Sequence, residues 1–169
     1  SKLAYTNDLA VAAQNSQLIL LVSPSQVMRH VLKDLKAYIT EDCLLVSAAK
    51  GIENGTLLTM FEVLQEVLGE QVAKRSAFLS GPSFAREVAV EQPTAVTVAA
   101  DNPEIAHRVQ EIFSTDYFRV YTNQDVVGVI RHVIITQYSV IKFVYRVHST
   151  RDHAVIVSAL ALPHRLIGT

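Results

Sequence analysis

The sequence has few of the features that mark secreted, membrane-embedded or nucleic-acid-binding proteins. It contains one cysteine, Cys43, so no internal disulfide can form, and a reducing, cytoplasmic setting is expected. No run approaches the ~18 uninterrupted apolar residues of a membrane span, and no signal peptide is evident after the polar residues 1–7. Charged residues make up 18% of the chain and its formal net charge is −1, which gives no case for nucleic-acid binding.

Charge is unevenly distributed along the chain. Residues 1–128 carry 15 acidic and 10 basic side chains, a net charge of −5. Residues 129–169 carry one acidic and five basic side chains, a net charge of +4, together with four of the six histidines. This change in composition predicts a boundary between residues 1–129 and a divergent tail, residues 130–169, whose pattern fits a strand pair as well as a helix.

Between residues 18 and 121, short apolar runs alternate with helical patterns. Runs of strand length occur at Leu18–Val22, Cys43–Ala48, Ser76–Ser80, Thr94–Ala99 and Phe118–Tyr121. Strands that are separated by helices pair in parallel through crossovers. The pattern therefore predicts an α/β fold, with a mostly parallel sheet that carries helices on both faces.

The expected helices have apolar stripes and end signals that a structure can test. The stripe of the first helix comprises Met28, Val31, Leu32 and Leu35. Thr56 is a candidate N-cap for the second helix and Gly69 a candidate stop. The expected stripe of this second helix comprises Leu57, Phe61, Leu64 and Leu68. Asn102 and Pro103 are typical of the start of a third helix.

Three loops directly follow expected strands. They are Ser23–Ser25, Lys50–Ile52 and Gly81–Ser83. In parallel α/β sheets, ligands bind beyond the carboxyl ends of the strands. We therefore expect these loops to lie along one edge of the sheet and to include the ligand-binding residues.

Lys50 has two interpretations. The simpler one is a solvated lysine at the end of a strand. The functional one is a cation placed where an anionic substrate or cofactor binds, because its ammonium supplies a compact charge with three donors. Gly51 beside it would let a ligand approach the backbone closely.

The string from Ser80 to Glu87 also has two interpretations. Ser83 can simply cap a short helix, its hydroxyl accepting a backbone N–H. The same geometry creates an anion or hydroxyl site at a helix N-terminus after a strand. Gly81 would remove side-chain bulk from that site, and Ala85 would keep the first helical turn small.

Metal chemistry is not expected from this sequence. His148 and His153 lie five residues apart with Asp152 between them, but no cysteine or glutamate completes a recognisable metal spacing. Cys43, inside an apolar strand, is expected to be an inert core residue rather than a nucleophile.

Residues 1–129 resemble the bacterial-type NAD(P)-dependent glycerol-3-phosphate dehydrogenases. The resemblance rests on strings that occur in the family's order and spacing: Leu18–Gln26, Ala49–Glu53, Leu79–Val88, Gln92–Val96, Phe118–Tyr121 and Asp125–Val129. The serine-glycine-proline-serine-phenylalanine-alanine string is highly specific to that family, whereas a lysine-glycine pair alone would be weak.

The resemblance implies the interconversion of glycerone phosphate and glycerol 3-phosphate, with NAD or NADP, for phospholipid synthesis. It implies a Rossmann-like, doubly wound sheet. By motif position, Lys50 would contact both cofactor and substrate, Gly81 and Ser83 would contact the substrate, and Ala85 would contact the cofactor. A homodimer is compatible with it, and no nucleic acid or membrane partner is implied.

The sequence departs from the family's pattern in two respects. It has no G-x-G-x-x-G fingerprint, so the first βαβ unit is expected to be lacking. After Val129 the pattern is lost: Thr136 and Gln137 occupy the positions of the family's lysine-asparagine pair, of which the lysine transfers the proton. A threonine hydroxyl cannot act as a cationic acid at neutral pH. No complete second domain is expected in the remaining residues.

Three functions remain open at this point. The leading one is an oxidoreductase chain that is incomplete as given, with little activity of its own. The second is a non-catalytic remnant that binds a nucleotide or a partner. The third is a related dehydrogenase for another small acid or phosphate, against which the Gly81–Ala85 string argues.

Overall fold

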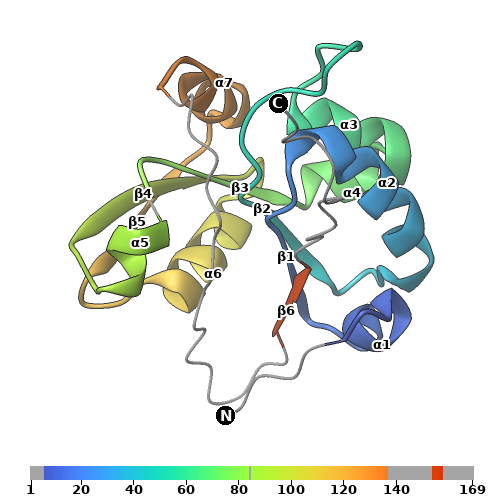
Figure 1. Cartoon of the computed structure of the whole chain (residues 1–169), viewed down its shortest axis with the longest axis horizontal. Helices are drawn as coiled ribbons and strands as arrows, with labels where there is room; N and C mark the ends of the chain where they lie inside the picture. Colours follow the sequence, from blue (N-terminus) through green and yellow to red (C-terminus); the bar gives the residue numbers. More distant parts are fainter. Residues whose placement is uncertain (1–5, 84, 137–153, 158–169) are drawn as a thin grey trace, which may run out of the picture.

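The structure, a computed structural model, describes residues 6–83, 85–136 and 154–157 (Figure 1). The strands within these ranges are β1 (Leu18–Leu21), β2 (Leu44–Ser47), β3 (Ala77–Ser80), β4 (Thr94–Ala99), β5 (Phe118–Asn123) and β6 (Ala154–Val157). The helices are α1 (Leu9–Ala13), α2 (Ser25–Leu35), the 3-10 helix η1 (Lys36–Tyr38), α3 (Met60–Leu68), α4 (Glu70–Lys74), α5 (Ala85–Ala89), α6 (Pro103–Phe113) and α7 (Val126–Thr136).

One sheet contains all of these strands, in the order β5-β4-β3-β2-β1-β6. Every neighbouring pair is parallel except β3 and β4, which run antiparallel. The prediction of a mostly parallel sheet is therefore confirmed. Because β1, β2 and β3 are mutually parallel, the loops that follow them leave the sheet along a common edge.

Both faces of the sheet are covered by helices. In β1, Ile19 and Leu21 point into a core that they share with α2, α3 and α7. Leu18 and Leu20 point into a second core, which they share with α5 and α6. Successive residues of a strand face opposite sides, so a strand that is buried on both faces reads as a continuous apolar run. The doubly wound prediction is confirmed, and Figure 1 shows α2 and α3 grouped on one side of β1 and α6 on the other.

The helix α2 has the predicted stripe, since Met28, Val31, Leu32 and Leu35 are all buried. The helix α6 begins as predicted: the Asn102 side chain accepts a hydrogen bond from the Glu104 amide, and Pro103 is the first helical residue. Gly69 ends α3 with φ +98°, a conformation that favours glycine. These signals act over one or two turns, which is why the sequence revealed them.

The start of α3 was predicted wrongly. The helix begins at Met60 rather than after Thr56, and its N-cap is Thr59, whose hydroxyl accepts from the Glu62 amide while the Glu62 carboxylate accepts from the Thr59 amide. The buried stripe is accordingly Met60, Val63, Leu64 and Val67. Leu57, which was expected in the stripe, is 69% exposed.

The described parts of the predicted tail, residues 130–136 and 154–157, continue the fold. The helix α7 extends to Thr136, and β6 pairs in parallel with β1. Predictions that fall on residues 137–153 and 158–169, including those for Gln137, His148 and His153, lie outside the described residues. Among the helices of the described ranges, none has the length and apolarity to cross a membrane.

Candidate functional site

The three predicted loops lie together at one edge of the sheet. The Gln26 side chain, one residue beyond the first loop, donates to the Ile52 carbonyl oxygen of the second at 2.8 Å. The Lys50 ammonium of the second loop donates to the Gly81 carbonyl oxygen of the third. These two contacts link loops that are 26 and 31 residues apart in sequence, and they confirm the shared edge.

The Gly81 carbonyl oxygen is the centre of the candidate site. Besides the Lys50 ammonium, it accepts from the Ser83 amide at 3.0 Å and from the Ser83 hydroxyl at 3.4 Å. Lys50, Gly81 and Ser83 are therefore brought together as the sequence predicted. Ala85, partly buried, is the first residue of α5, two residues beyond Ser83.

Lys50 is not a freely solvated lysine. Its side chain is partly buried, and this burial lowers the pKa of the ammonium to about 8. At pH 7 the protonated form still predominates, although by a smaller margin than for an exposed lysine. Lys50 can therefore bind an anion at neutral pH, and its proton is more easily released than that of an ordinary lysine.

Gly81 is required at its position by geometry. Its φ is +143°, and an added Cβ would lie 2.9 Å from Val96 Cα and 3.1 Å from the Ala95 carbonyl oxygen. The strand β4 thus passes directly against the site glycine. The close approach arises from the antiparallel pairing of β3 and β4, where Ser80 is the partner of Thr97.

A small cavity lies beside the cluster, and the centre of a water molecule can occupy about 20 Å³ of it. Its lining comprises Ser47, Ala49, Gly51, Met60, Phe78, Leu79, Ser80 and Ile130. The Ser80 hydroxyl donates to the Val129 carbonyl oxygen at 3.1 Å, whereas the buried Ser47 hydroxyl has no partner among the described residues. The volume suits one water molecule rather than a nucleotide.

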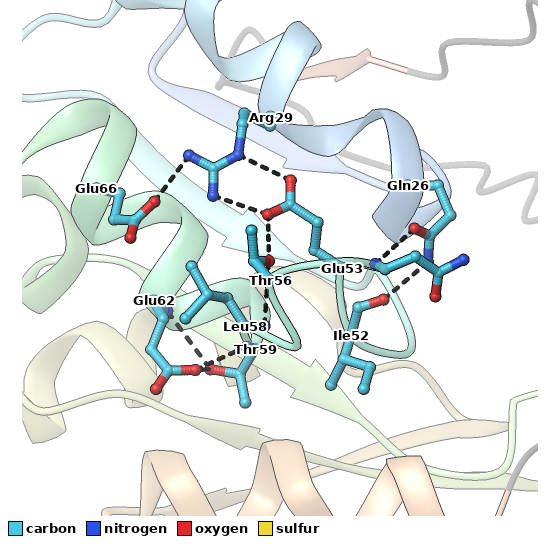
Figure 2. Close-up of polar contacts among 10 residues, drawn as sticks. Gln26, Arg29, Ile52, Glu53, Thr56, Leu58, Thr59, Glu62 and Glu66 are labelled. Atoms are coloured by element: carbon cyan, nitrogen blue, oxygen red, sulfur yellow. Dashed lines mark hydrogen bonds and ion pairs between the residues drawn. The ribbon is translucent and has the colours of Figure 1, made fainter.

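The sequence did not reveal the ion-pair network that joins α2 and α3 to the loop after Lys50 (Figure 2). Arg29 of α2 donates two hydrogen bonds of 2.8 Å to the Glu53 carboxylate and forms a third contact of 2.8 Å with Glu66 of α3. The Thr56 hydroxyl donates to the same Glu53 carboxylate at 2.6 Å. The sequence offered one signal for this network, which is that Glu53 follows closely after Lys50 and Gly51. This signal does not identify Arg29, 24 residues earlier, as the partner of Glu53.

The pairing of Glu53 predicts a pH-dependent contribution to stability. The Arg29 hydrogen bonds, and next the Thr56 hydrogen bond, lower the pKa of Glu53 to about 2 from an ordinary value of 4.5. A lowered folded-state pKa stabilises the fold above the unfolded pKa, and this stabilisation disappears as pH falls from about 4.5 towards about 2. We expect Glu53→Gln to reduce the free energy of unfolding at pH 7, and the difference from wild type to shrink across that window.

Urea denaturation followed by circular dichroism at several pH values tests this prediction. Glu111→Gln, a change at an exposed residue of α6, is the control and should alter stability by less than about 0.5 kcal/mol. A difference between wild type and Glu53→Gln that stays constant from pH 7 to pH 2 contradicts the assigned role of the carboxylate.

Metal ligands do not gather in the described part of the chain. Within it, no group of three or more histidine, cysteine, aspartate or glutamate side chains could hold a metal ion. Cys43 is buried in an apolar core, where burial raises the pKa of its thiol. The polar groups of the candidate site are the Lys50 ammonium, the backbone of Gly81 and Ser83, and the Ser83 hydroxyl.

Comparison with known proteins supports one family. Residues 1–106 match the family model described as the N-terminus of NAD-dependent glycerol-3-phosphate dehydrogenase. A glycerol-3-phosphate dehydrogenase [NAD(P)+] of Syntrophotalea carbinolica is 56% identical over 128 residues, 76% of this chain and 38% of the relative. The same enzyme of Geobacter metallireducens is 48% identical over 169 aligned residues, 97% of this chain and 50% of the relative, so that match extends into residues 130–169.

Solved structures agree with this result. The glycerol-3-phosphate dehydrogenase of Coxiella burnetii has a TM-score of 0.66 and 33% identity, over 73% of this chain and 37% of that chain. A pyrroline-5-carboxylate reductase of the same organism, at 17% identity and a TM-score of 0.58, shows the shared fold alone. The chain spans between 38% and 50% of the length of the two curated relatives described above.

Proposed function

The chain belongs to the NAD-dependent glycerol-3-phosphate dehydrogenase family, and from this membership we propose that it forms part of the dinucleotide-binding domain of an enzyme that interconverts glycerone phosphate and glycerol 3-phosphate with NAD or NADP. The cluster of Lys50, Gly81 and Ser83 at the carboxyl edge of the sheet carries the proposal. It combines a cation, a close-approach glycine and a hydroxyl on neighbouring post-strand loops, where ligands bind in such sheets. A lysine ammonium is a compact charge with three donors, which suits an anionic phosphate ester.

In this proposal each site residue has a defined role. The Lys50 ammonium contacts both the cofactor and the substrate, and it stabilises negative charge that develops on the substrate oxygen. Gly81 and Ser83 contact the substrate, and Ala85 contacts the cofactor. The nicotinamide, when bound, supplies or accepts the hydride. The chain's own contribution is to orient the substrate and to place a positive charge, and orientation alone can account for roughly 7–11 kcal/mol of a barrier.

The second candidate function is suggested by the residue at the position that transfers the proton in the family. The position of the family's proton-transferring lysine is held by Thr136, at the end of α7. A threonine hydroxyl does not supply an acid of matched pKa, and general acid catalysis typically contributes about 10²–10⁴-fold in rate. This substitution favours the alternative of a chain that binds a nucleotide or a partner without hydride transfer.

We further propose a division at residue 129 and a cytoplasmic setting. The change from net negative to net positive composition supports the division. The presence of one cysteine, Cys43, with which no internal disulfide can form, supports a reducing compartment. The family proposal also implies a role in phospholipid synthesis and assembly as a homodimer. Both of these proposals depend on it.

A chimera separates the two functions. Residues 1–129 replace the matching segment of the Geobacter metallireducens relative, and NADH or NADPH oxidation is followed with glycerone phosphate. If the site residues of this chain support hydride transfer, the turnover number of the chimera should lie within about tenfold of that of the unmodified relative. The median turnover number of enzymes is about 10 per second.

The 169-residue chain is assayed beside the chimera. A folded chimera without turnover contradicts the dehydrogenase proposal. NADPH binding by the 169-residue chain without turnover, while the chimera is active, assigns the deficit to residues outside 1–129.

A further inference from the structure

The loop that carries Lys50 is fastened to the first turns of α2. The Gln26 side chain donates to the Ile52 carbonyl oxygen at 2.8 Å and accepts from the Asn54 amide at 2.7 Å (Figure 2). Gly51 adopts φ +96°, and a Cβ there would lie 3.3 Å from the Ser25 hydroxyl. The backbone on the carboxyl side of Lys50 therefore lies against α2 with little space between them.

An ion pair between Glu53 and Arg29 also binds this loop to α2. The buried Glu53 carboxylate receives both 2.8 Å bonds from Arg29 and the Thr56 hydroxyl bond. Two parallel bonds between a guanidinium and a carboxylate fix direction as well as distance. Glu53 also closes its own turn, because its amide donates to the Leu58 carbonyl oxygen and its carbonyl accepts from the Leu57 amide, both at 2.9 Å.

The pair is not needed to hold the two helices together. Met28, Val31 and Leu32 of α2 share one apolar core with Val63, Leu64 and Val67 of α3. Arg29 reaches α3 through Glu66, whose side chain is 54% exposed, so that this outer contact contributes little. The contact that is buried is the one with the loop, and it adds to the Gln26 bonds in fixing where the loop lies.

We propose that Arg29 and Glu53 are positioning residues that hold Lys50 against Gly81, and this inference rests on the proposed role of Lys50 in substrate binding. Glu53 lies three residues after Lys50 and itself contacts neither Gly81 nor Ser83 in the bonds described above. It acts through the backbone of Gly51 and Ile52. When the pair is broken, the loop moves away from α2 and the Lys50 ammonium leaves the Gly81 carbonyl for solvent.

Competitive acetylation of the full 169-residue chain, read by mass spectrometry as a function of pH, tests this inference. The amine of Lys50 should react in wild type with a midpoint near its pKa of about 8. In Glu53→Gln and in Arg29→Met we expect the midpoint to rise by about one pH unit or more, because a solvated lysine titrates near 10.4. Arg29→Lys, which keeps the charge but loses the fork, should give an intermediate midpoint.

Three controls make the result specific. Glu66→Gln removes only the exposed contact of Arg29 and should leave the Lys50 midpoint unchanged. The buried thiol of Cys43 should stay unreactive to iodoacetamide in every variant, which shows that the core is folded. The acetylation midpoint of the exposed Lys74 reports any general change in reactivity.

The outcomes are distinct for the two proposals. An unchanged Lys50 midpoint in folded Glu53→Gln and Arg29→Met overturns the positioning role, as does an equal rise in Glu66→Gln. If Cys43 becomes reactive in a variant, that variant is not folded, and Arg29→Lys is used in its place. The Lys50 midpoint must then rise in Arg29→Lys. Protection of wild-type Lys50 by NADPH with glycerol 3-phosphate tests the proposed function separately, because its absence leaves the positioning result standing.

Discussion

Replacing Lys50 with methionine in the chimera should lower kcat/KM for glycerone phosphate by roughly 10- to 100-fold. A hydrogen bond to a charged group contributes about 1.5–3 kcal/mol, and about 1.4 kcal/mol corresponds to a tenfold change in rate. Methionine keeps an apolar stem of similar length but has no charge and no donor for the Gly81 carbonyl oxygen. Because burial disfavours the ammonium, its removal should not unfold the domain.

The matched control is Lys74→Met. Lys74 is 53% exposed on α4, paired with Glu70, and should leave kcat/KM unchanged. Steady-state kinetics over a range of glycerone phosphate and NADPH concentrations provide the measurement. Equal kinetic constants for Lys50→Met and the unmodified chimera show that Lys50 contacts neither ligand, and the assignment of this edge as the active site then fails.

Gly81→Ala should cost about 2–5 kcal/mol of the free energy of unfolding in the 169-residue chain. An alanine Cβ would lie 2.9 Å from Val96 Cα and 3.1 Å from the Ala95 carbonyl oxygen, both backbone atoms of the sheet. Forcing extra volume into a packed region costs about 1–3 kcal/mol, and a left-handed backbone costs an L-residue about 1–2 kcal/mol more. Urea denaturation followed by circular dichroism measures the loss.

Gly55→Ala separates the two causes. Gly55 also has a positive φ, +85°, but a Cβ there would meet nothing within 4 Å. Its replacement should therefore cost only the backbone term, about 1–2 kcal/mol. If the two variants lose the same stability, β4 yields to the added methyl group at no cost, and the approach of Gly81 to Val96 is not a constraint on the site.

Local signals in the sequence predicted much of the architecture. The apolar run at Leu18–Leu21 indicated a strand buried on both faces, because helices cover both surfaces of a doubly wound sheet. The Asn102–Pro103 start of α6 and the Gly69 end of α3 were found because capping involves residues within one turn. The edge location of Lys50, Gly81 and Ser83 followed from parallel topology alone, without knowledge of any side-chain contact.

The start of α3 shows the limit of such signals. The sequence predicted Thr56 as the N-cap of this helix, but the N-cap in the structure is Thr59. In the structure, the Thr56 hydroxyl is bound to Glu53, and Glu53 is held by Arg29 of another helix. The reciprocal bonds of Thr59 and Glu62 then begin the helix three residues later than expected.

The sequence by itself determined the alternation of strands and helices, the two buried faces and the set of residues at the carboxyl edge, because these depend on periodicity and chain order. Only the tertiary structure decided the antiparallel pairing of β3 with β4, the approach of Val96 to Gly81 and the pairing of Arg29 with Glu53. Each of these joins residues 15 or more positions apart, through close packing or an ion pair in three dimensions. No local pattern encodes such a partner, since the same residue types also occur at many exposed positions.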